Sequence, residues 1–400
     1  MSNPLAQLIS VADARQLIQQ YAKPLPVKQW PLQVAAGCCL ATDVKSAVQV
    51  PAFWQSSMDG YAYAWEAGRS EYELVGEQAA GKAHAEPLQP GQAVRIFTGA
   101  ALPAGADTVL MQEKAAVNNG MLQVQDELLQ RGANVRPPGS ELQQGETILP
   151  AGTWLTAAAM GVLASTGLPS VPVYPRPSVA IIVTGNELQA PGLPLQYGEV
   201  YEANSYALLT ALQRLHIQAS VQRVPDDPAA LATAITQQLA KCDILLVTGG
   251  VSVGDYDYTP QALAAAGAIT IFHKVKQKPG KPLLFAMRGQ QLLFGLPGNP
   301  ASVLSCFYQY VLPAIGSVMQ LPLVLSSVQL PLQHAWQKPA GLTHFLKARV
   351  ADGAVSMMQG QESYKLRSFA QANALAELPA DQTQWQAGDL IQVHLLPTPY

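Results

Sequence analysis

The chain has 400 residues, of which 49% are hydrophobic and 13% are charged, and its formal net charge is −3. This length can form two to four domains with sizeable cores. No apolar run reaches the length of a membrane span and no basic run stands out, so we expect neither a membrane protein nor a nucleic-acid partner.

The first predicted element is a helix that ends near Tyr21. Ser10 is its expected N-cap, and Asp13, three residues later, completes a capping box. Its apolar face carries Val11, Ala14, Leu17, Ile18 and Tyr21. No basic region followed by a continuous apolar stretch is found at this end of the sequence, so we expect no export signal and a cytoplasmic protein.

The rest of the chain changes pattern twice. From about residue 40 to residue 148, short strands alternate with turns rich in Gly and Pro, as in YELVGEQAAG and GMLQVQ, which predicts a β-rich region. After a proline cluster at 171–178, strands such as VAIIVTG and DILLVTGG alternate with helices. These strands are apolar on both faces, which predicts a parallel sheet covered by helices on both sides. Beyond Leu321 the pattern returns to strands, and we expect a small terminal β domain.

Three strands of the predicted sheet end in similar loops, namely IIVTGNEL, LLVTGGVSVGDYDYT and LLFGLPGNPAS. Ligands of open α/β sheets bind outside the carboxyl ends of the strands. Glycine allows backbone N–H groups to approach a ligand, and the next helix N-terminus favours anions. A single glycine loop could serve the turn alone, but three with polar side chains favour a ligand crevice.

Several acids follow these strands: Glu187, Asp226, Asp227, Asp255 and Asp257. Any one of them could simply cap a helix, as Asp227 before Pro228 and Asp257 before Tyr258 could. Together they would place several carboxylates at one rim. Carboxylates beside a phosphate site usually hold Mg²⁺, so we interpret Glu187, Asp227 and Asp257 as metal ligands with catalytic roles.

Lysines supply the opposite charge in HKVKQKPGKPLLFA. Alternation places Lys274, Lys276 and Lys278 on one face of an extended segment, and Lys281 follows a Pro-Gly turn. Such lysines can protect an edge strand from pairing. In a chain this poor in charge, we favour binding of phosphate or another oxyanion.

Two further features are open on spacing alone. The four cysteines contain no CxxC pair, so neither a zinc site nor a disulfide framework is indicated. Asp59 stands in FWQSSMDGYA within the β-rich region, where a lone Asp-Gly is normally a turn.

The segments together resemble the molybdopterin molybdenumtransferase family, the molybdenum insertases related to the gephyrin E domain. The matching stretches are SSMDGYA, RIFTGAALPAGADTVLMQE, VTGNEL, DDP, TGGVSVGDYDYT, KVKQKPGKP and GLPGNPAS, in that order. The resemblance covers nearly the whole chain and is looser in GLTHFLKARV and SYKLRSFAQANAL.

The resemblance implies a fold and a domain order. It implies a multi-domain α/β plus all-β protein: a three-layer α/β molybdopterin-binding domain (1–23 and 178–322), a linker or β domain (24–45 and 143–177), a β-rich arm (46–142) and a C-terminal β-barrel (323–400). It also implies a homodimer with shared active sites, in which Asp59 reaches the partner subunit's crevice. Other implied partners are the molybdopterin adenylyltransferase and molybdoenzymes.

The implied reaction is insertion of molybdate into adenylyl-molybdopterin, with Mg²⁺ as cofactor and release of AMP. No nucleophilic triad is visible, and none is needed if a molybdate oxygen attacks the activated phosphate. The expected catalytic residues are Asp59, Glu187, Asp227, Asp257, Lys274 and Lys278. The expected substrate-binding residues are Thr98, Arg136, Thr184, Gly185, Gly249, Gly250, Ser252, Lys281, Pro297, Gly298, Asn299, Pro300, Ser302, Lys347, Ser363 and Ser368.

The sequence departs from the family pattern at Asn186 and Glu202, where acid and aspartate are usual, and at Lys347, where arginine is common. A lysine cannot hold a tetrahedral oxyanion as an arginine does. Three alternatives stay open. The chain could be the preceding adenylyltransferase, a non-catalytic scaffold, or a paralogue for another oxyanion such as tungstate.

Overall fold

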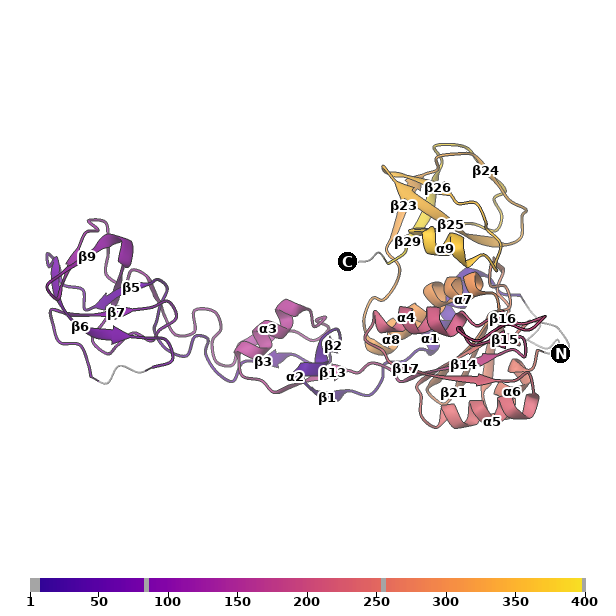
Figure 1. Cartoon of the computed structure of the whole chain (residues 1–400), viewed down its shortest axis with the longest axis horizontal. Coiled ribbons are helices and arrows are strands. Elements are labelled where there is room, and N and C mark those ends of the chain that lie inside the picture. Colours follow the sequence, from indigo (N-terminus) through magenta and orange to yellow (C-terminus); the bar gives the residue numbers. More distant parts are fainter. Residues whose placement is uncertain (1–7, 83–85, 253–256, 398–400) are drawn as a thin grey trace. The chain divides into compact units, whose positions relative to one another are not determined.

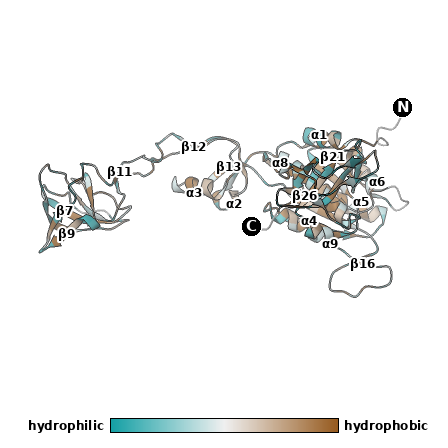
Figure 2. Cartoon of the chain, turned by 90° about the horizontal axis from the view of Figure 1, so that it is seen from above, coloured by the Kyte–Doolittle hydropathy of each residue, from teal (hydrophilic) through white to brown (hydrophobic). Residues whose placement is uncertain are grey.

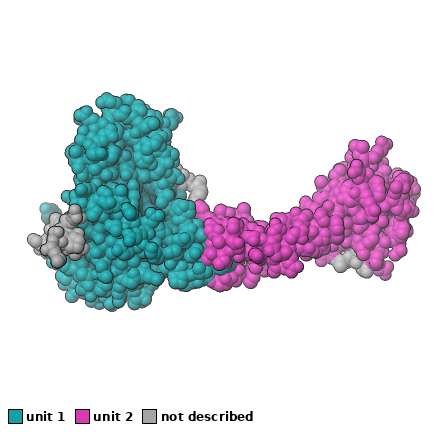
Figure 3. Space-filling model, turned by 180° about the vertical axis from the view of Figure 1, so that it is seen from behind, with its two compact units in different colours: residues 1–28, 37–39, 172–400 teal, residues 29–36, 40–171 magenta. Residues whose placement is uncertain are grey.

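The computed structural model describes residues 8–82, 86–252 and 257–397, and Asp255 therefore lies outside the described residues. The chain folds into two compact units (Figures 1 and 3). Unit 1 comprises residues 1–28, 37–39 and 172–400, and unit 2 comprises residues 29–36 and 40–171. The chain passes between them four times. Three passages lie within the short strands β1 (Lys28–Pro31), β2 (Cys39–Leu40) and β13 (Ser170–Tyr174), and the fourth lies between Ala36 and Gly37. The finer four-part division stays a prediction.

Unit 1 begins with the predicted helix, α1 (Val11–Tyr21). Ser10 Oγ accepts a hydrogen bond from Asp13 N at 3.0 Å, and the Asp13 carboxylate accepts one from Ser10 N at 3.3 Å. This confirms the capping box. Val11, Ala14 and Ile18 are buried as expected, whereas Tyr21 is 36% exposed.

A six-stranded sheet forms the centre of unit 1, in the order β17-β14-β18-β22-β21-β19. The first four strands are parallel, and β21 runs antiparallel to both its neighbours, β22 and β19. The antiparallel edge was not predicted. It arises because β21 returns into β22 across two residues, which is a hairpin connection. The strands are β14 (Val179–Thr184), β17 (Ala219–Val224), β18 (Ile244–Thr248), β19 (Ile269–His273), β21 (Leu284–Arg288) and β22 (Gln291–Leu296).

Both faces of this sheet are buried, as the apolar strands predicted. Alternate residues of β14 enter different cores: Ile181 packs in the core with α1, α4, α7 and α8, and Ile182 packs in the core with α5 and α6. Figure 1 shows these two helix groups on opposite sides of the sheet. The helices are α4 (Asn204–Gln213), α5 (Pro228–Leu239), α6 (Thr259–Ala265), α7 (Pro300–Cys306) and α8 (Leu312–Met319).

Helices α7 and α8 are parts of one 20-residue helix, Pro300–Met319, joined by a π-helical segment, η3 (Phe307–Val311). Among the described residues, this is one helix long and apolar enough to cross a membrane, with a mean hydropathy of 1.3. However, 78% of its apolar window is buried within the protein, and it packs in the core of unit 1. The position of this helix in the core of a folded domain explains why its residues are mostly apolar.

The C-terminal part of unit 1 is β-rich, as predicted. Strands β26, β25, β27, β29 and β23 follow one another in a sheet, and β20 (Gln277–Lys278) adds to β25. A bridge between Leu332 and Val355 links the β23 end to β26, which closes the sheet into a small barrel. The elements are β23 (Ser327–Pro331), β24 (Trp336–Gln337), β25 (Thr343–Ala351), β26 (Ala354–Met357), α9 (Leu366–Gln371), β27 (Ala374–Leu378), β28 (Gln384–Trp385) and β29 (Leu390–Leu395).

Unit 2 is built around a second six-stranded sheet in the order β8-β5-β7-β6-β10-β9. Its two faces carry separate small cores, one around Ile96 and one around Tyr63 and Leu110. Figure 2 shows apolar segments on strands and helices of both units. The sheet strands are β5 (Gly60–Tyr63), β6 (Glu71–Gln78), β7 (Gln92–Ile96), β8 (Thr108–Met111), β9 (Ala115–Asn118) and β10 (Met121–Val124). The other elements are α2 (Leu32–Ala35), β3 (Val44–Lys45), β4 (Gln55–Ser56), η2 (Gln112–Lys114), β11 (Val135–Arg136), β12 (Thr147–Leu149) and α3 (Ala157–Ser165).

Candidate functional site

The structure brings the three glycine loops together at the carboxyl ends of β14, β18 and β22, which are neighbours in the sheet. Gly249 has a φ of 94°, and an added Cβ there would lie 2.7 Å from Thr184 O. Its N–H donates to Leu296 O at 3.1 Å. An added Cβ on Gly298 would lie 4.0 Å from Gly249 Cα. Glycine is therefore required at Gly249, where a side chain would push the first two loops apart, whereas the distance at Gly298 is an ordinary van der Waals contact.

The first loop, after β14, is held by Asp226, which follows β17, rather than by Glu187, the acid within the loop. The Asp226 carboxylate accepts hydrogen bonds from Thr184 Oγ1 and from Asn186 N, and Asn186 Oδ1 accepts from Asp226 N at 3.0 Å. Asn186 supplies one acceptor and leaves the neighbouring carboxylate unopposed by a second negative charge. This reciprocal pair gives the departure at Asn186 a structural role. The exposed Glu187 carboxylate lies over Gly185, where an added Cβ would come within 2.8 Å of its Oε2.

The three predicted metal ligands are not gathered into one group. Among the described residues, which include Glu187, Asp227 and Asp257, no three His, Cys, Asp or Glu side chains are placed to hold a metal ion. Asp227 Oδ1 instead accepts from Ala230 N at 2.7 Å and caps α5. The assignment of these three carboxylates to a metal ion stays a prediction. In this conformation, capping turns the Asp227 carboxylate back onto its own helix.

The second loop, after β18, keeps its turn through backbone contacts. Thr259 N donates to Gly250 O, and Thr259 Oγ1 donates to Gly249 O, both at 3.0 Å. Helix α6 begins at Thr259, and its N-cap residue is Tyr258 rather than Asp257. Ser252 is exposed at the start of the loop. Asp257 thus differs from Asp227, for which capping is observed.

The third loop joins the α/β sheet to the C-terminal strands. Pro297 is buried, Gly298 is exposed, and α7 begins at Pro300 with Asn299 as N-cap. Asn299 Nδ2 donates to Ser363 Oγ at 2.9 Å, and Ala301 N donates to Ser363 O at 3.1 Å. The structure therefore places Ser363 beside the predicted loop, whereas Ser302 is buried.

Lys347 and Ser368 hold the segment that presents Ser363. The buried Lys347 ammonium donates to the carbonyls of Gly360, Glu362 and Lys365, which uses its three donors. Burial lowers the pKa of Lys347. Ser368 Oγ donates to the Gly360 carbonyl as well. In this arrangement neither side chain offers a donor to an oxyanion, so both act on the loop.

The lysine segment is only partly extended. Lys276 and Lys278 are exposed and alternate with buried Val275 and Gln277, as predicted. Lys274 is different because its φ is 78°, which breaks the alternation. The predicted single face for all three lysines is therefore wrong at Lys274. The Pro-Gly turn before exposed Lys281 is confirmed by Gly280, whose φ is 82°.

Lys278 pairs in register with His344 across β20 and β25. Burial and the charges of Lys338 and Lys278 lower the pKa of His344 to about 4. His273 lies near the second loop, where its Nε2 contacts Val251 O at 2.7 Å, and burial lowers its pKa. Both imidazoles are therefore neutral at pH 7.

Asp59 lies in unit 2, on the turn before β5. Its Oδ1 accepts from Thr98 N at 2.8 Å and from Thr98 Oγ1 at 2.7 Å, so two predicted site residues meet here. These hydrogen bonds, with the charge of Arg95, lower the pKa of Asp59, and the exposed carboxylate stays ionised. An added Cβ on Gly60 would lie 1.8 Å from Leu110 O, which explains the glycine after Asp59.

Arg136 lies in the same unit as Asp59. Its strand β11 pairs with β4, so that Arg136 is opposite Gln55 and Val135 is opposite Ser56. Arg136 is exposed and lines a cavity of about 580 Å³ together with Gln55 and Glu141. The guanidinium is therefore accessible to a ligand from solvent.

Sequence reasoning missed two buried polar groups at the sheet edge. Thr248 ends β18 with 1% exposure, and Asn204 begins α4 with 6% exposure. Thr248 Oγ1 and Asn204 Oδ1 have no hydrogen-bond partner among the described residues, although Asn204 Nδ2 donates to Gly298 O at 2.8 Å. Buried polar atoms without a partner require an explanation, and these two lie beside the glycine loops. The only sequence signal was their place after VYEA and within LLVTGG.

The loops at the sheet edge therefore define an α/β ligand-binding protein. Residues 180–317, which contain these loops, match a family described as a probable molybdopterin binding domain. Residues 9–167 match the MoeA N-terminal region (domain I and II), and residues 329–396 match the MoeA C-terminal region (domain IV).

Relatives over nearly the full length agree with this. A molybdopterin molybdenumtransferase from a Nostoc species is 36% identical, covering 99% of this chain and 95% of that protein. The one from Haemophilus influenzae is 30% identical, with coverage of 97% and 100%. A crystal structure of a molybdopterin biosynthesis MoeA protein from Pyrococcus horikoshii superposes with a TM-score of 0.78 at 25% identity, covering 98% of this chain and all of that one. The chain belongs to the molybdopterin molybdenumtransferase family.

Proposed function

We propose that the protein inserts molybdate into adenylyl-molybdopterin and releases AMP, in the cytoplasm. The proposal is supported chiefly by the meeting of three glycine loops at one edge of the sheet, where Gly249 contacts Thr184 and approaches Gly298. Backbone this close, beside the unsatisfied Thr248 and Asn204 oxygens, suits a polar heterocyclic ligand that supplies hydrogen-bond donors. Membership of a family named for molybdopterin supports a molybdopterin-type substrate.

Charge neutralisation and positioning would carry the catalysis. The substrates bring phosphates and molybdate, and exposed Lys278 and Lys281 offer ammonium groups from the lysine segment. Lys274, with its altered backbone, is the least secure member of this group. Cleavage of the phosphoanhydride bond of adenylyl-molybdopterin would release AMP. The ionised carboxylate of Asp59 would orient a substrate group near the reacting atoms.

Mg²⁺ fits this site only in part. A closed cage of three carboxylates is absent from the described residues, but Mg²⁺ commonly binds one or two carboxylates and completes its shell with substrate phosphates and water. The exposed Glu187 and the half-buried Asp257 are the residues that would hold it. Bound there, the ion would neutralise phosphate charge.

We propose a homodimer with shared sites, in which Asp59 serves the partner subunit. Mixing Asp59→Ala subunits with Asp257→Asn subunits should restore roughly one competent site per heterodimer. The mixture must be unfolded and refolded together, so that subunits exchange. Unrecovered AMP release in verified heterodimers would reject the shared site.

The test of the reaction is incubation with adenylyl-molybdopterin, Mg²⁺ and molybdate. AMP release that depends on molybdate supports insertion, whereas pyrophosphate release from ATP and molybdopterin would support an adenylyltransferase. Absence of both activities would favour a scaffold. Replacing molybdate by tungstate in the same assay decides which oxyanion is preferred, and Lys278→Ala and Lys281→Ala should raise the molybdate concentration needed for half-maximal insertion.

A further inference from the structure

The lysine turn, residues 278–281, is held from within the core by three buried side chains. Gln277 Nε2 donates to the carbonyl of Gly280 at 2.9 Å. Cys306 lies against the same glycine, where an added Cβ would come within 2.4 Å of Sγ. Tyr310 completes the group, because its phenol donates to Gln277 Oε1. The turn thus carries exposed lysines on its outside and rests on buried polar contacts on its inside.

The directions of these hydrogen bonds are fixed by chemistry. Burial raises the pKa of Tyr310 well above its ordinary value, so the phenol keeps its proton at pH 7 and can donate. Gln277 Oε1 can only accept, so it faces Tyr310 and leaves Nε2 for Gly280 O. Nε2 also lies 3.6 Å from Cys306 Sγ. Both polar atoms of this buried amide therefore have partners, and the partners set its orientation.

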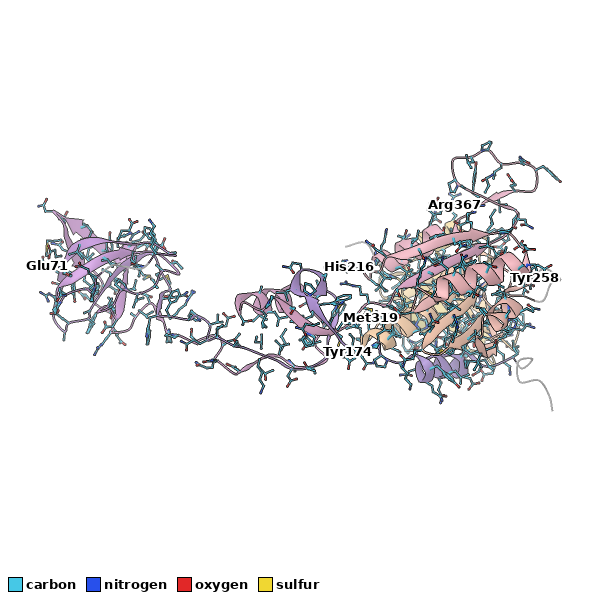
Figure 4. All side chains as sticks on the ribbon, turned by 90° about the horizontal axis from the view of Figure 1, so that it is seen from below. Glu71, Tyr174, His216, Tyr258, Met319 and Arg367 are labelled. Carbon is cyan, nitrogen blue, oxygen red and sulfur yellow. The ribbon has the colours of Figure 1, made fainter. Side chains whose placement is uncertain are left out.

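The helix that carries two of these side chains also begins at the third glycine loop. Cys306 and Tyr310 belong to the 20-residue helix that starts at Pro300 in that loop. Figure 4 labels Met319, at the end of this helix, and Tyr258, at the second loop, on opposite sides of unit 1. The helix therefore starts at the loops and runs away from them through the core. A packed helix is rigid, so groups tied to it keep their spacing.

The chain that leads into the lysine turn is tied to the second glycine loop. His273 Nε2 contacts Val251 O at 2.7 Å. Val275 N then donates to Lys281 O at 2.9 Å, which closes the segment on itself. The lysine segment is therefore fixed to the second loop at its start and to the helix of the third loop at its turn.

We propose that Gln277 and Tyr310 are positioning residues that act on the reaction through the ammonium groups of Lys278 and Lys281. By tying the Gly280 carbonyl to the helix of the third loop, they set where these two charges meet molybdate. Both residues are only 1% exposed, so neither contacts the substrate itself. The inference rests on the proposed role of the two lysines in binding the oxyanion.

The first test measures AMP release against molybdate concentration in Tyr310→Phe, which removes only the hydroxyl. The half-saturating molybdate concentration should rise about tenfold, less than the loss that can follow when a positioned group moves by about 1 Å, and the rate at saturation should change little. Tyr308→Phe removes a hydroxyl from the same helix and is the matched control. Tyr308 stacks near Phe369 and has no hydrogen bond to the lysine turn among the described residues, so its variant should keep the parent's value.

Replacing both partners separates stability from position. Gln277→Met and Tyr310→Phe each leave a buried polar atom of the other residue without a partner, whereas the double variant removes both groups and should unfold closer to the parent's temperature. A network that served stability alone would then regain the parent's molybdate dependence. We expect the double variant to keep the raised half-saturating concentration, because the Gly280 carbonyl still lacks its tie to the helix. If Tyr310→Phe does not fold, the double variant decides.

A double-mutant cycle tests whether the effect passes through the lysines. In a protein that also carries Lys278→Ala and Lys281→Ala, Tyr310→Phe should no longer change the molybdate dependence. Calorimetric titration with sodium molybdate alone makes the same comparison without turnover. An unchanged molybdate dependence in folded Tyr310→Phe, or an equal effect with and without the two lysines, would overturn the inference.

Failure of the proposed function would give a different result. If Lys278→Ala and Lys281→Ala leave the parent's molybdate dependence unchanged, the proposed oxyanion site is wrong, and the positioning role is overturned with it. If no AMP is released but molybdate binds, the proposed reaction is wrong, and the titration of Tyr310→Phe against the parent decides the positioning role.

Discussion

The two units each hold one group of expected site residues, and the two groups are built differently. In unit 2, Asp59 and Arg136 are exposed side chains, with Asp59 held by Thr98 and Arg136 set on a short strand pair. In unit 1, the site consists of backbone brought together by glycines. Most polar side chains around it are occupied in fastening that backbone, as Asp226 and Lys347 are. Unit 2 thus contributes exposed charged side chains, whereas unit 1 combines closely packed loop backbone with the exposed Glu187, Lys278 and Lys281.

This difference predicts which substitutions affect turnover and which affect folding. A charged side chain exposed in unit 2 can be removed without structural loss, because water replaces its contacts. A side chain that fastens a loop in unit 1 cannot be removed so easily, because its buried partners would be left unsatisfied.

The largest effect is expected at Asp59. Asp59→Asn should reduce AMP release by about 10²–10³-fold, the loss typical of removing one group that acts electrostatically at the reacting centre. Thermal unfolding should change little, since the position is exposed and asparagine keeps a side-chain oxygen that accepts from Thr98. Asp126→Asn, in the same unit, is the control and should keep full activity. A folded Asp59→Asn protein with normal turnover would remove Asp59 from the mechanism.

The next effect is expected at Gly249. Gly249→Ala should destabilise the protein by about 3 kcal/mol, from a left-handed backbone and a Cβ 2.7 Å from Thr184 O. Gly192→Ala is a closely matched control, because Gly192 has a φ of 93° and no atom within 4 Å of an added Cβ. It should cost only about 1 kcal/mol, measured by urea unfolding. Equal losses in both variants would show that the contact between the loops is unimportant.

Substitution of Lys347 tests whether this lysine holds the segment 360–365 or binds an oxyanion. Lys347→Met should lower the free energy of unfolding by about 2 kcal/mol, because three carbonyl groups lose their donor. Lys276→Met, at an exposed position, should stay within about 0.5 kcal/mol of the parent. If Lys347→Met is as stable as the parent but needs more molybdate, Lys347 is an oxyanion ligand after all.

The last effect, at His344, is absent at pH 7 and appears only on acidification. The pKa of His344 is about 4 in the folded protein and lies below the ordinary 6.5, so the unfolded chain binds the proton more readily. The corresponding stability is complete above pH 6.5 and is lost as pH falls toward 4, by up to about 3 kcal/mol. His344→Gln should flatten this part of the unfolding profile, and Lys278→Ala should raise the imidazole pKa in an NMR titration. An unchanged profile in His344→Gln would assign the pH dependence to other groups.

Much of the fold could be predicted from the sequence because it depends on local patterns. The Ser10–Asp13 box and the apolar strands of the central sheet are of this kind. The roles of the acids and lysines could not be predicted, because each role depends on which donor or acceptor the folded chain brings next to the charged group. Asp226 and Asp227 are neighbours in sequence, yet one fastens a loop and the other caps a helix. Lys347 resembled an anion ligand until its three carbonyl partners were seen.

The three carbonyl oxygens around the Lys347 ammonium make this side chain a tethered counterpart of a bound monovalent cation. A free K⁺ or Na⁺ held by such oxygens would exchange with solvent, and its occupancy would follow the ionic composition of the medium. Here the cation is covalently part of the chain, and its local concentration is fixed. The segment 360–365, and with it the contact of Ser363 with Asn299, should therefore keep its conformation whichever alkali ions the cell contains.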